Sequence, residues 1–127
     1  LEQLLHLDEY GVEAIGDKRI IQAGGLAILH GHEAQLSSGV NQARGAFLKM
    51  NTSTLTGHGH KISAYSEPDL WRQETASWSQ GCLCDLSPEY ARINKWSWGF
   101  ACVTLAKDGE YEVDNYRITQ KGKVRPA

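Results

Sequence analysis

Two histidine-rich tripeptides are the part of this sequence best suited to chemistry. His30-Gly31-His32 follows the apolar run Leu26–Leu29, and His58-Gly59-His60 follows the short run Ser53–Thr56. Together they contain four of the five histidines in the chain. Neutral imidazole binds transition metals such as Zn, Fe, Ni and Cu. The pair of tripeptides therefore predicts half of a metal site; the alternative is histidines that only cap strand ends with hydrogen bonds.

The segment between the tripeptides has the pattern of a helix. We expect it to run from about Val40 to Met50, with Ser37 or Ser38 as the N-cap. Its apolar stripe consists of Val40, Ala43, Ala46 and Phe47. A strand–helix–strand unit makes its two strands parallel and neighbouring, with a right-handed crossover. Both tripeptides are then expected at the carboxyl edge of one sheet, where α/β folds bind ligands.

The residues before the first tripeptide predict short elements. Leu1 to Tyr10 reads as the end of a helix, stopped by Gly11. Val12–Ile15 and Arg19–Gln22 read as two strands, joined by a turn at Gly16-Asp17-Lys18.

After Lys61 the pattern changes to antiparallel β structure. The expected segments are extended Ile62–Ser66, a turn at Glu67-Pro68-Asp69, Trp71–Ser79, a short β piece at Gly81–Leu86, and a hairpin of Gly99–Ala106 with Tyr111–Ile118. The tail from Thr119 reads as a frayed end. Since no linker is visible, residues 1–127 are treated as a single unit of the α/β class: a β-α-β unit followed by an antiparallel β-layer.

The cysteines and tryptophans of the second half allow two interpretations each. Cys82 and Cys84 would share one face of a strand, either as soft metal ligands or as small buried hydrophobes. The second interpretation is favoured, because Cys102 alone does not supply the second ligand pair that a zinc site usually has. The four tryptophans are expected to fill the core of a small β-layer rather than to stack on bases or sugars.

Composition excludes several classes of protein. A formal net charge of −2 gives no general attraction to nucleic acid or to anionic membrane. No apolar run approaches the roughly 20 residues that span a bilayer, so no membrane association is expected. An odd number of cysteines without a secretory signal pattern indicates free thiols in a reducing compartment, hence a cytoplasmic protein. The first residue is Leu1, so the chain is interpreted as processed or as part of a longer product.

The pattern of strand, His30-Gly31-His32-Glu33, helix, strand and Gly57-His58-Gly59-His60 resembles the C-terminal half of the calcineurin-like metallophosphoesterases. The segment from Asn94 to Ala101 resembles phage and bacterial members of that family. The resemblance implies a four-layer α/β/β/α sandwich whose two-metal centre hydrolyses phosphoesters. Its two divalent ions, drawn from Mn, Fe, Zn and Ni, would lie about 3.5–4 Å apart, activate water and clamp the phosphoryl oxygens.

Carried over residue by residue, the resemblance makes His30 one metal ligand. It makes His58 and His60 the loop pair, one for each metal. His32 and Glu33 are assigned to the rim or the outer shell of the site. Apart from the resemblance, Asn41 and Arg44 are expected on another face of the helix. They are interpreted there as solvated polar residues, or alternatively as an arginine fork near an anionic substrate.

The sequence also departs from the family. The upstream Asp-x-His, Gly-Asp-x-x-Asp and Asn-His-Glu/Asp loops, which supply the bridging aspartate and the asparagine ligand, are not in this chain. The missing half is expected from a separate upstream polypeptide or from a removed N-terminal segment. Otherwise the chain is expected to self-associate, because the strand Leu26–Leu29 or its neighbour would expose a sheet edge.

Three functions follow from these patterns. The first is a hydrolase fragment acting on a phosphoester, with nucleotides and nucleic acids among the candidate substrates. The second is a non-catalytic module that binds metal or a partner protein. The third is a degenerate half-domain that serves as an interaction surface.

Overall fold

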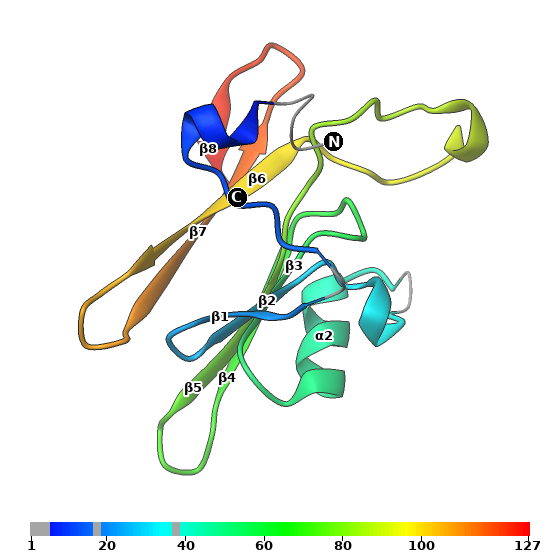
Figure 1. The fold of residues 1–127 in the computed structure, drawn as a ribbon. Helices are drawn as coiled ribbons and strands as arrows, with labels where there is room; N and C mark the ends of the chain where they lie inside the picture. Colours follow the sequence, from blue (N-terminus) through cyan, green and yellow to red (C-terminus); the bar gives the residue numbers. More distant parts are fainter. Residues whose placement is uncertain (1–5, 17–18, 37–38) are drawn as a thin grey trace.

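The computed structural model describes residues 6–16, 19–36 and 39–127 and contains two β-sheets (Figure 1). The larger sheet is mixed and has the strand order β1-β2-β3-β5-β4. The smaller sheet is antiparallel, with the order β6-β7-β8. The strands of the larger sheet are β1 (Ile21–Ala23), β2 (Leu26–Leu29), β3 (Thr54–Thr56), β4 (Ser63–Pro68) and β5 (Glu74–Ser79). Those of the smaller sheet are β6 (Gly99–Leu105), β7 (Tyr111–Ile118) and β8 (Val124–Pro126).

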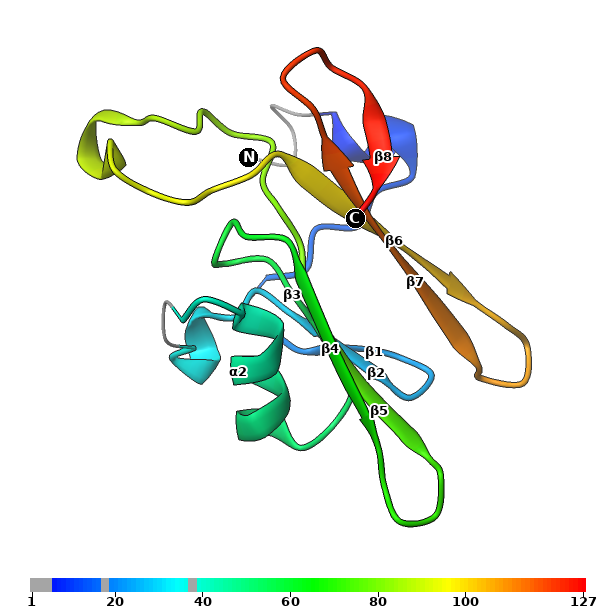
Figure 2. The ribbon, with the colours of Figure 1, turned by 180° about the vertical axis from the view of Figure 1, so that it is seen from behind.

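The described elements form three layers. Helix α2 (Gln42–Met50) packs on one face of the larger sheet, against β3, β4 and β5. The smaller sheet lies on the opposite face, as the two opposite views show (Figures 1 and 2). The rings of Trp78 and Tyr111 meet between the sheets, with centroids 6.4 Å apart. The predicted α/β class is therefore confirmed, as an α/β/β arrangement with a mixed and an antiparallel sheet.

The predicted β-α-β unit is confirmed. β2 and β3 pair in parallel, with Ile28 opposite Leu55, and α2 connects them. The apolar core lies between the larger sheet and the helix. The buried hydrophobic residues in the described part of the chain are Leu26, Leu29, Ala43, Ala46, Leu55 and Ala76. The two histidine tripeptides consequently leave the same edge of the sheet.

Strand β5 corrects the expectation of purely antiparallel pairing after Lys61. It lies between β3 and β4 and pairs in parallel with β3, with Thr54 opposite Ser77. Its buried residues are small, and two of the three, Ser77 and Ser79, are polar. The Thr54 hydroxyl donates a 2.9 Å hydrogen bond to the Ser77 hydroxyl. Because the buried side chains include serines, the sequence of this strand shows no apolar face. Burial of the serine hydroxyls is tolerated because they form hydrogen bonds.

Helix α2 begins two residues later than predicted, at Gln42. The Asn41 side chain caps it by accepting a 2.9 Å hydrogen bond from the Arg44 amide. The prediction of Ser37 or Ser38 as N-cap is wrong, and both serines lie outside the described residues. Val40, predicted in the apolar stripe, precedes the helix and is 94% exposed.

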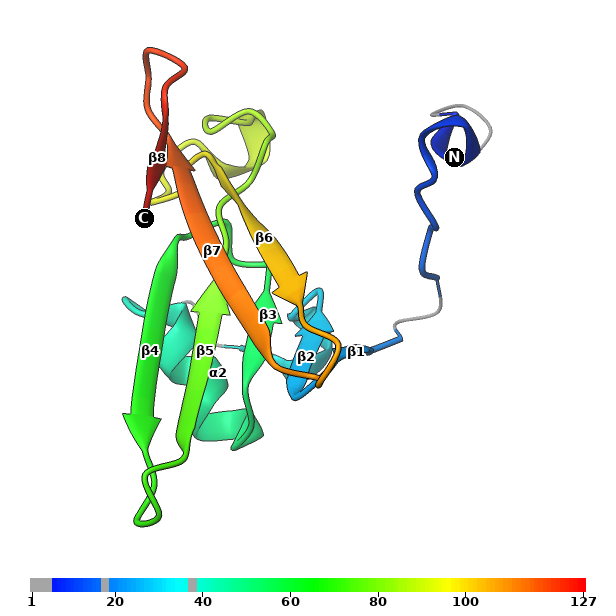
Figure 3. The ribbon, with the colours of Figure 1, turned by 90° about the vertical axis from the view of Figure 1, so that its left-hand side faces the viewer.

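The N-terminal region differs most from expectation. The 3-10 helix η1 (Leu7–Tyr10) ends at Gly11, whose φ of 65° suits the predicted glycine stop. The first half of the predicted helix (residues 1–5) and most of the predicted turn (residues 17 and 18) lie outside the described part of the chain. Val12–Ile15 forms no strand, and the strand expected at Arg19–Gln22 is β1, shifted to Ile21–Ala23. Figure 3 shows the described residues before β1, in dark blue, lying away from both sheets.

One further turn and the C-terminal tail also differ from the prediction. Glu67 and Pro68 belong to β4, and the turn lies at 69–73, where the Asp69 carboxylate accepts hydrogen bonds from the amides of Trp71 and Gln73. The predicted hairpin is confirmed as β6 and β7. The tail is not frayed, because β8 pairs with β7.

Short elements complete the described chain. These are the 3-10 helices η2 (His32–Ala34) and η3 (Glu89–Ala91). The β piece predicted at Gly81–Leu86 is reduced to one isolated bridge between Cys82 and Trp98. None of the helices in the described ranges is long and apolar enough to cross a membrane.

We expect Leu26→Ala to lower the free energy of unfolding by about 2–5 kcal/mol, because the side chain is 0% exposed and its loss leaves a cavity. Leu48→Ala is the matched control: Leu48 is 62% exposed on α2, and its truncation should cost under about 0.5 kcal/mol. Urea denaturation of both variants measures the difference. Equal destabilisation by the two changes would contradict this core.

Candidate metal centre

The two histidine tripeptides are bound to each other through the backbone. The His30 carbonyl accepts hydrogen bonds from the amides of Gly57, at 3.1 Å, and His58, at 2.7 Å. Gly31 has a φ of 111°, which glycine adopts readily, and a Cβ at this position would meet the Cβ of His58 at 3.2 Å. Glycine between the two histidines therefore permits the close approach of the loops.

Three imidazoles converge where the loops meet. The ring centroid of His30 lies 4.9 Å from that of His32 and 4.8 Å from that of His58. The rings of His32 and His58 are 6.0 Å apart. The Nδ1 atoms of His30 and His32 form a 2.8 Å hydrogen bond, in which one ring donates to the other. These three residues are called the imidazole cluster below.

Glu33 adds a carboxylate to the imidazole cluster. Its Oε2 accepts a 2.8 Å hydrogen bond from the Gly31 amide and lies 3.5 Å from Nδ1 of His32. Hydrogen bonds from the backbone amides of Glu33 itself and of Gly31 lower the pKa of this carboxyl group. Glu33 therefore remains an anion at neutral pH, the form that binds a cation. Ligand atoms of His30, His32 and Glu33 all lie within 4.8 Å of one another.

The spacing of the imidazole cluster fits a metal ion. Two imidazole nitrogens bound to one zinc at about 2.0–2.1 Å lie roughly 2.9–3.4 Å apart, for angles between octahedral and tetrahedral. The 2.8 Å separation of the His30 and His32 nitrogens is close to this range. All three histidines are exposed, so an ion can reach them. The cluster can thus bind a divalent transition metal with small adjustments of side-chain torsions.

His60 lies apart from the other three histidines of the tripeptides. Its φ of 54° turns the ring toward the second half of the chain, where it contacts Trp96 edge-on, with centroids 4.4 Å apart. Its Nδ1 lies 3.9 Å from Sγ of Cys84. Burial lowers the pKa of His60, and the nearby His58 and His30 lower it further. The structure thus brings together His30, His32 and His58, whereas the family pattern selected His30, His58 and His60.

The two cysteines near His60 correct a sequence interpretation. Cys82 is half-buried and Cys84 is exposed, so the pair does not form part of the apolar core. Burial raises the pKa of the Cys82 thiol, and its hydrogen bond to Cys84 raises it further. The thiols and the His60 ring form a second group of ligand atoms, all within 4.8 Å of one another. Their Cys-x-Cys spacing was the available signal, but no pattern in the sequence linked it to His60.

The remaining candidate residues have structural contacts. Asn41 is the cap of α2, and Arg44 lies over the ring of Tyr65, 5.7 Å from its centroid. Trp71 is 82% exposed in the turn between β4 and β5, so its assignment to the core is wrong. Trp78, Trp96 and Trp98 are half-buried.

Two hollows adjoin the imidazole cluster. One, of about 640 Å³, extends from His58 to Lys61, Lys95 and Trp96. The other, of about 380 Å³, is lined by His30, His32 and Glu33 and by apolar residues of the N-terminal region and of β1 and β2. The cluster is therefore accessible from both sides.

No protein-family model matches this chain, and neither a curated protein nor a solved structure matches it significantly. A functional assignment therefore depends on the geometry of the two groups of ligands.

We expect Gly31→Ala to weaken Zn²⁺ binding about 10- to 100-fold, as when groups that orient metal ligands are removed. The new methyl group would be strained at a φ of 111° and would press on His58. Gly45→Ala is the control, since a Cβ there meets nothing within 4 Å and should stabilise α2 by about 0.5–1 kcal/mol. Calorimetric titration with Zn²⁺ compares the affinities. An unchanged affinity in Gly31→Ala would contradict the described approach of the loops.

Proposed function

We propose that this chain supplies the histidine-rich half of a two-metal centre that hydrolyses phosphoesters. The observation that carries the proposal is the convergence of His30, His32 and His58 at the carboxyl edge of two parallel strands. Neutral imidazole is a common ligand of transition metals, and three of them here lie close enough together to share one ion.

The roles of individual residues combine this geometry with the family resemblance. His30 and His58 bind the first metal, and His32 and Glu33 complete or orient its ligand shell. His60, on the same loop as His58, binds the second metal. Two ions held by these residues would supply an activated water and positive charge for the oxygens of a phosphoryl group. Mn, Fe, Zn and Ni all accept mixed nitrogen and oxygen ligands, so each is a candidate.

The hollow beside His58 supports a phosphoester as substrate. Lys61 and Lys95 line it and offer positive charge to a phosphate, while Trp96 offers a ring face to an aromatic substituent. A volume of about 640 Å³ is in the usual range for a small-molecule site. A nucleotide, or an end of a nucleic acid, has both of these chemical parts.

The proposal requires ligands from outside this chain. The bridging aspartate and the asparagine ligand of the resembled family have no counterpart here, so we propose that a preceding segment or a separate polypeptide provides them. Such a half would also complete the four-layer sandwich. Two features support this: β1 is an edge strand of the larger sheet, and Ile21 within it and Ile20 just before it have exposed apolar side chains. Self-association through the same edge is the alternative.

A second function is supported by the composition of the imidazole cluster. Among the described residues, Glu33 is the carboxylate that lies with His30 and His32, and together they offer ligands to one ion. A non-catalytic module that binds one metal ion would need nothing more than these side chains.

Hydrolysis of bis(p-nitrophenyl) phosphate with Mn²⁺ tests the proposed function. The 127-residue chain alone should show little or no activity, because half of the ligands are missing. The chain preceded by the residues encoded immediately upstream of Leu1 should hydrolyse the diester, and His58→Ala should abolish that activity.

His6→Ala is the matched control in the extended protein, because His6 is paired with Glu9 in the N-terminal region and is not part of the cluster. It should leave activity unchanged. Stoichiometric metal binding without hydrolysis by the extended protein would favour the non-catalytic module. Enzyme-like activity of the 127-residue chain alone would contradict the need for a second half.

A further inference from the structure

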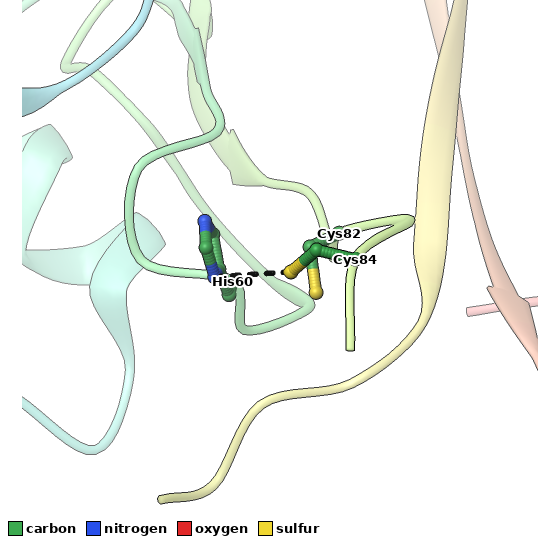
Figure 4. A group of neighbouring side chains, drawn as sticks. All are labelled: His60, Cys82 and Cys84. Carbon is green, nitrogen blue, oxygen red and sulfur yellow. Dashed lines mark hydrogen bonds between the residues drawn. The ribbon is translucent and has the colours of Figure 1, made fainter. Parts of the chain in front are cut away.

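The second group of ligand atoms joins three residues that are distant in the sequence. His60 follows β3, while Cys82 and Cys84 follow β5, and these strands are parallel neighbours. Their ring nitrogen and two sulfur atoms lie within 4.8 Å of one another (Figure 4). We call these three residues the cysteine group. Parallel pairing places it at the same sheet edge as the imidazole cluster.

Backbone hydrogen bonds hold the cysteine group on one short segment, 97–99. The Ser97 amide donates to the His60 carbonyl at 2.9 Å, and the Ser97 carbonyl accepts from the Cys82 amide at 2.9 Å. The Gly99 amide donates to the Cys82 carbonyl at 3.1 Å. The indole of Trp98 donates to the Cys84 carbonyl at 2.8 Å. The three ligand residues are therefore positioned by main-chain contacts before any ligand binds.

Glycines permit this close packing. A Cβ at Gly81 would overlap the Ser97 carbonyl and the Gly99 amide, so only glycine fits between the two segments. The edge of Trp96 also packs on the His60 ring. Because segment 97–99 and Trp96 already hold the cysteine group in place, it loses little conformational entropy when a ligand binds.

The geometry points to a thiolate-bearing zinc site: we propose that His60, Cys82 and Cys84 bind one Zn²⁺ ion. Tetrahedral zinc, with Zn–N near 2.0 Å and Zn–S near 2.3 Å, separates nitrogen from sulfur by about 3.6 Å and two sulfurs by about 3.8 Å. The observed distance from His60 Nδ1 to Cys84 Sγ is 3.9 Å. Binding displaces one proton from each thiol to the solvent, and each sulfur then donates an electron pair to the ion.

Three protein ligands leave the fourth position of a tetrahedral ion open. Cys84 is exposed, so water or an external ligand can reach that position. Sites with three protein ligands and one open position are typical of catalytic rather than structural zinc. Thiolate ligands also favour zinc over Mn or Mg, which prefer oxygen.

This site does not depend on the proposed phosphoesterase function, because it is carried by its own contacts. His60 is the residue that the two proposals share. If both hold, the second metal position carries sulfur ligands, and zinc is the ion that occupies it.

Cobalt titration of the reduced 127-residue chain tests the proposal. Co²⁺ replaces zinc in tetrahedral sites and gives an intense near-ultraviolet charge-transfer band only when thiolates bind it. We expect this band to reach its full intensity when one Co²⁺ ion is bound at the cysteine group of each chain, and to disappear when Zn²⁺ is added. Cys84→Ser and His60→Ala should each weaken binding at this site more than about 100-fold, beyond the effect of losing an outer-shell partner.

Cys102→Ser is the matched control, since Cys102 is also an exposed free thiol but lies in β6, outside the group. It should leave the band and the affinity unchanged. Zn²⁺ should likewise protect Cys82 and Cys84, but not Cys102, from alkylation by iodoacetamide, as measured by peptide mass spectrometry. A His30→Ala, His58→Ala double variant should retain the charge-transfer band.

Absence of a charge-transfer band from the wild-type chain would overturn the zinc site. A band that persists in the Cys82→Ser, Cys84→Ser double variant would also overturn it. The same holds if iodoacetamide alkylates all three cysteines equally in the presence of Zn²⁺. These results concern only the binding of metal by the cysteines, whereas the phosphoesterase proposal is tested by hydrolysis of the diester. The failure of the zinc site is therefore distinguishable from the failure of the proposed function.

Discussion

The arrangement at the metal-binding edge depends on one contact, in which two consecutive amides, Gly57 and His58, donate to the carbonyl of His30. This contact extends the parallel pairing of β2 and β3 by one step beyond the strands themselves. It brings the backbone of one tripeptide against that of the other, where the φ of 111° at Gly31 favours glycine and an added Cβ would lie 3.2 Å from that of His58. The imidazoles of His30, His32 and His58 lie side by side as a result. Without parallel pairing they would leave opposite edges of the sheet.

Beneath this edge, the larger sheet is held by buried polar groups as well as by its apolar core. Thr54 donates to Ser77, and Ser79 donates to Gln42, so that β3, β5 and α2 are joined by side-chain hydrogen bonds. Gln42 also packs against Gly59, where a Cβ would overlap its amide. Burying hydroxyl and amide groups is tolerated because they are paired, and each unpaired one would cost about 1–3 kcal/mol. The same contacts that build the sheet thus position the second histidine loop.

The elements with strong periodicity could be predicted from the sequence, whereas the directions of the site side chains could not. Leu26–Leu29 and the β6–β7 hairpin show clear apolar or turn patterns, and the structure confirms them. The antiparallel pairing of β5 with β4 agrees with the expectation, but its parallel pairing with β3 was not predicted, because Ser77 and Ser79 carry no apolar signal for burial. The φ of 54° at His60 results from tertiary packing, so its separation from His58 and its approach to Cys84 had no signature in the local sequence. The position of His32 within the imidazole cluster follows similarly from the φ of Gly31.

The central claim is that the imidazole cluster is a metal centre. Anomalous diffraction at the zinc absorption edge, from crystals of the zinc-loaded chain, tests it most directly. A peak about 2.0–2.1 Å from ring nitrogens of at least two of His30, His32 and His58 is the predicted result. Zinc density that is missing from this cluster, in crystals where the three rings are ordered and free of lattice contacts, would contradict the claim.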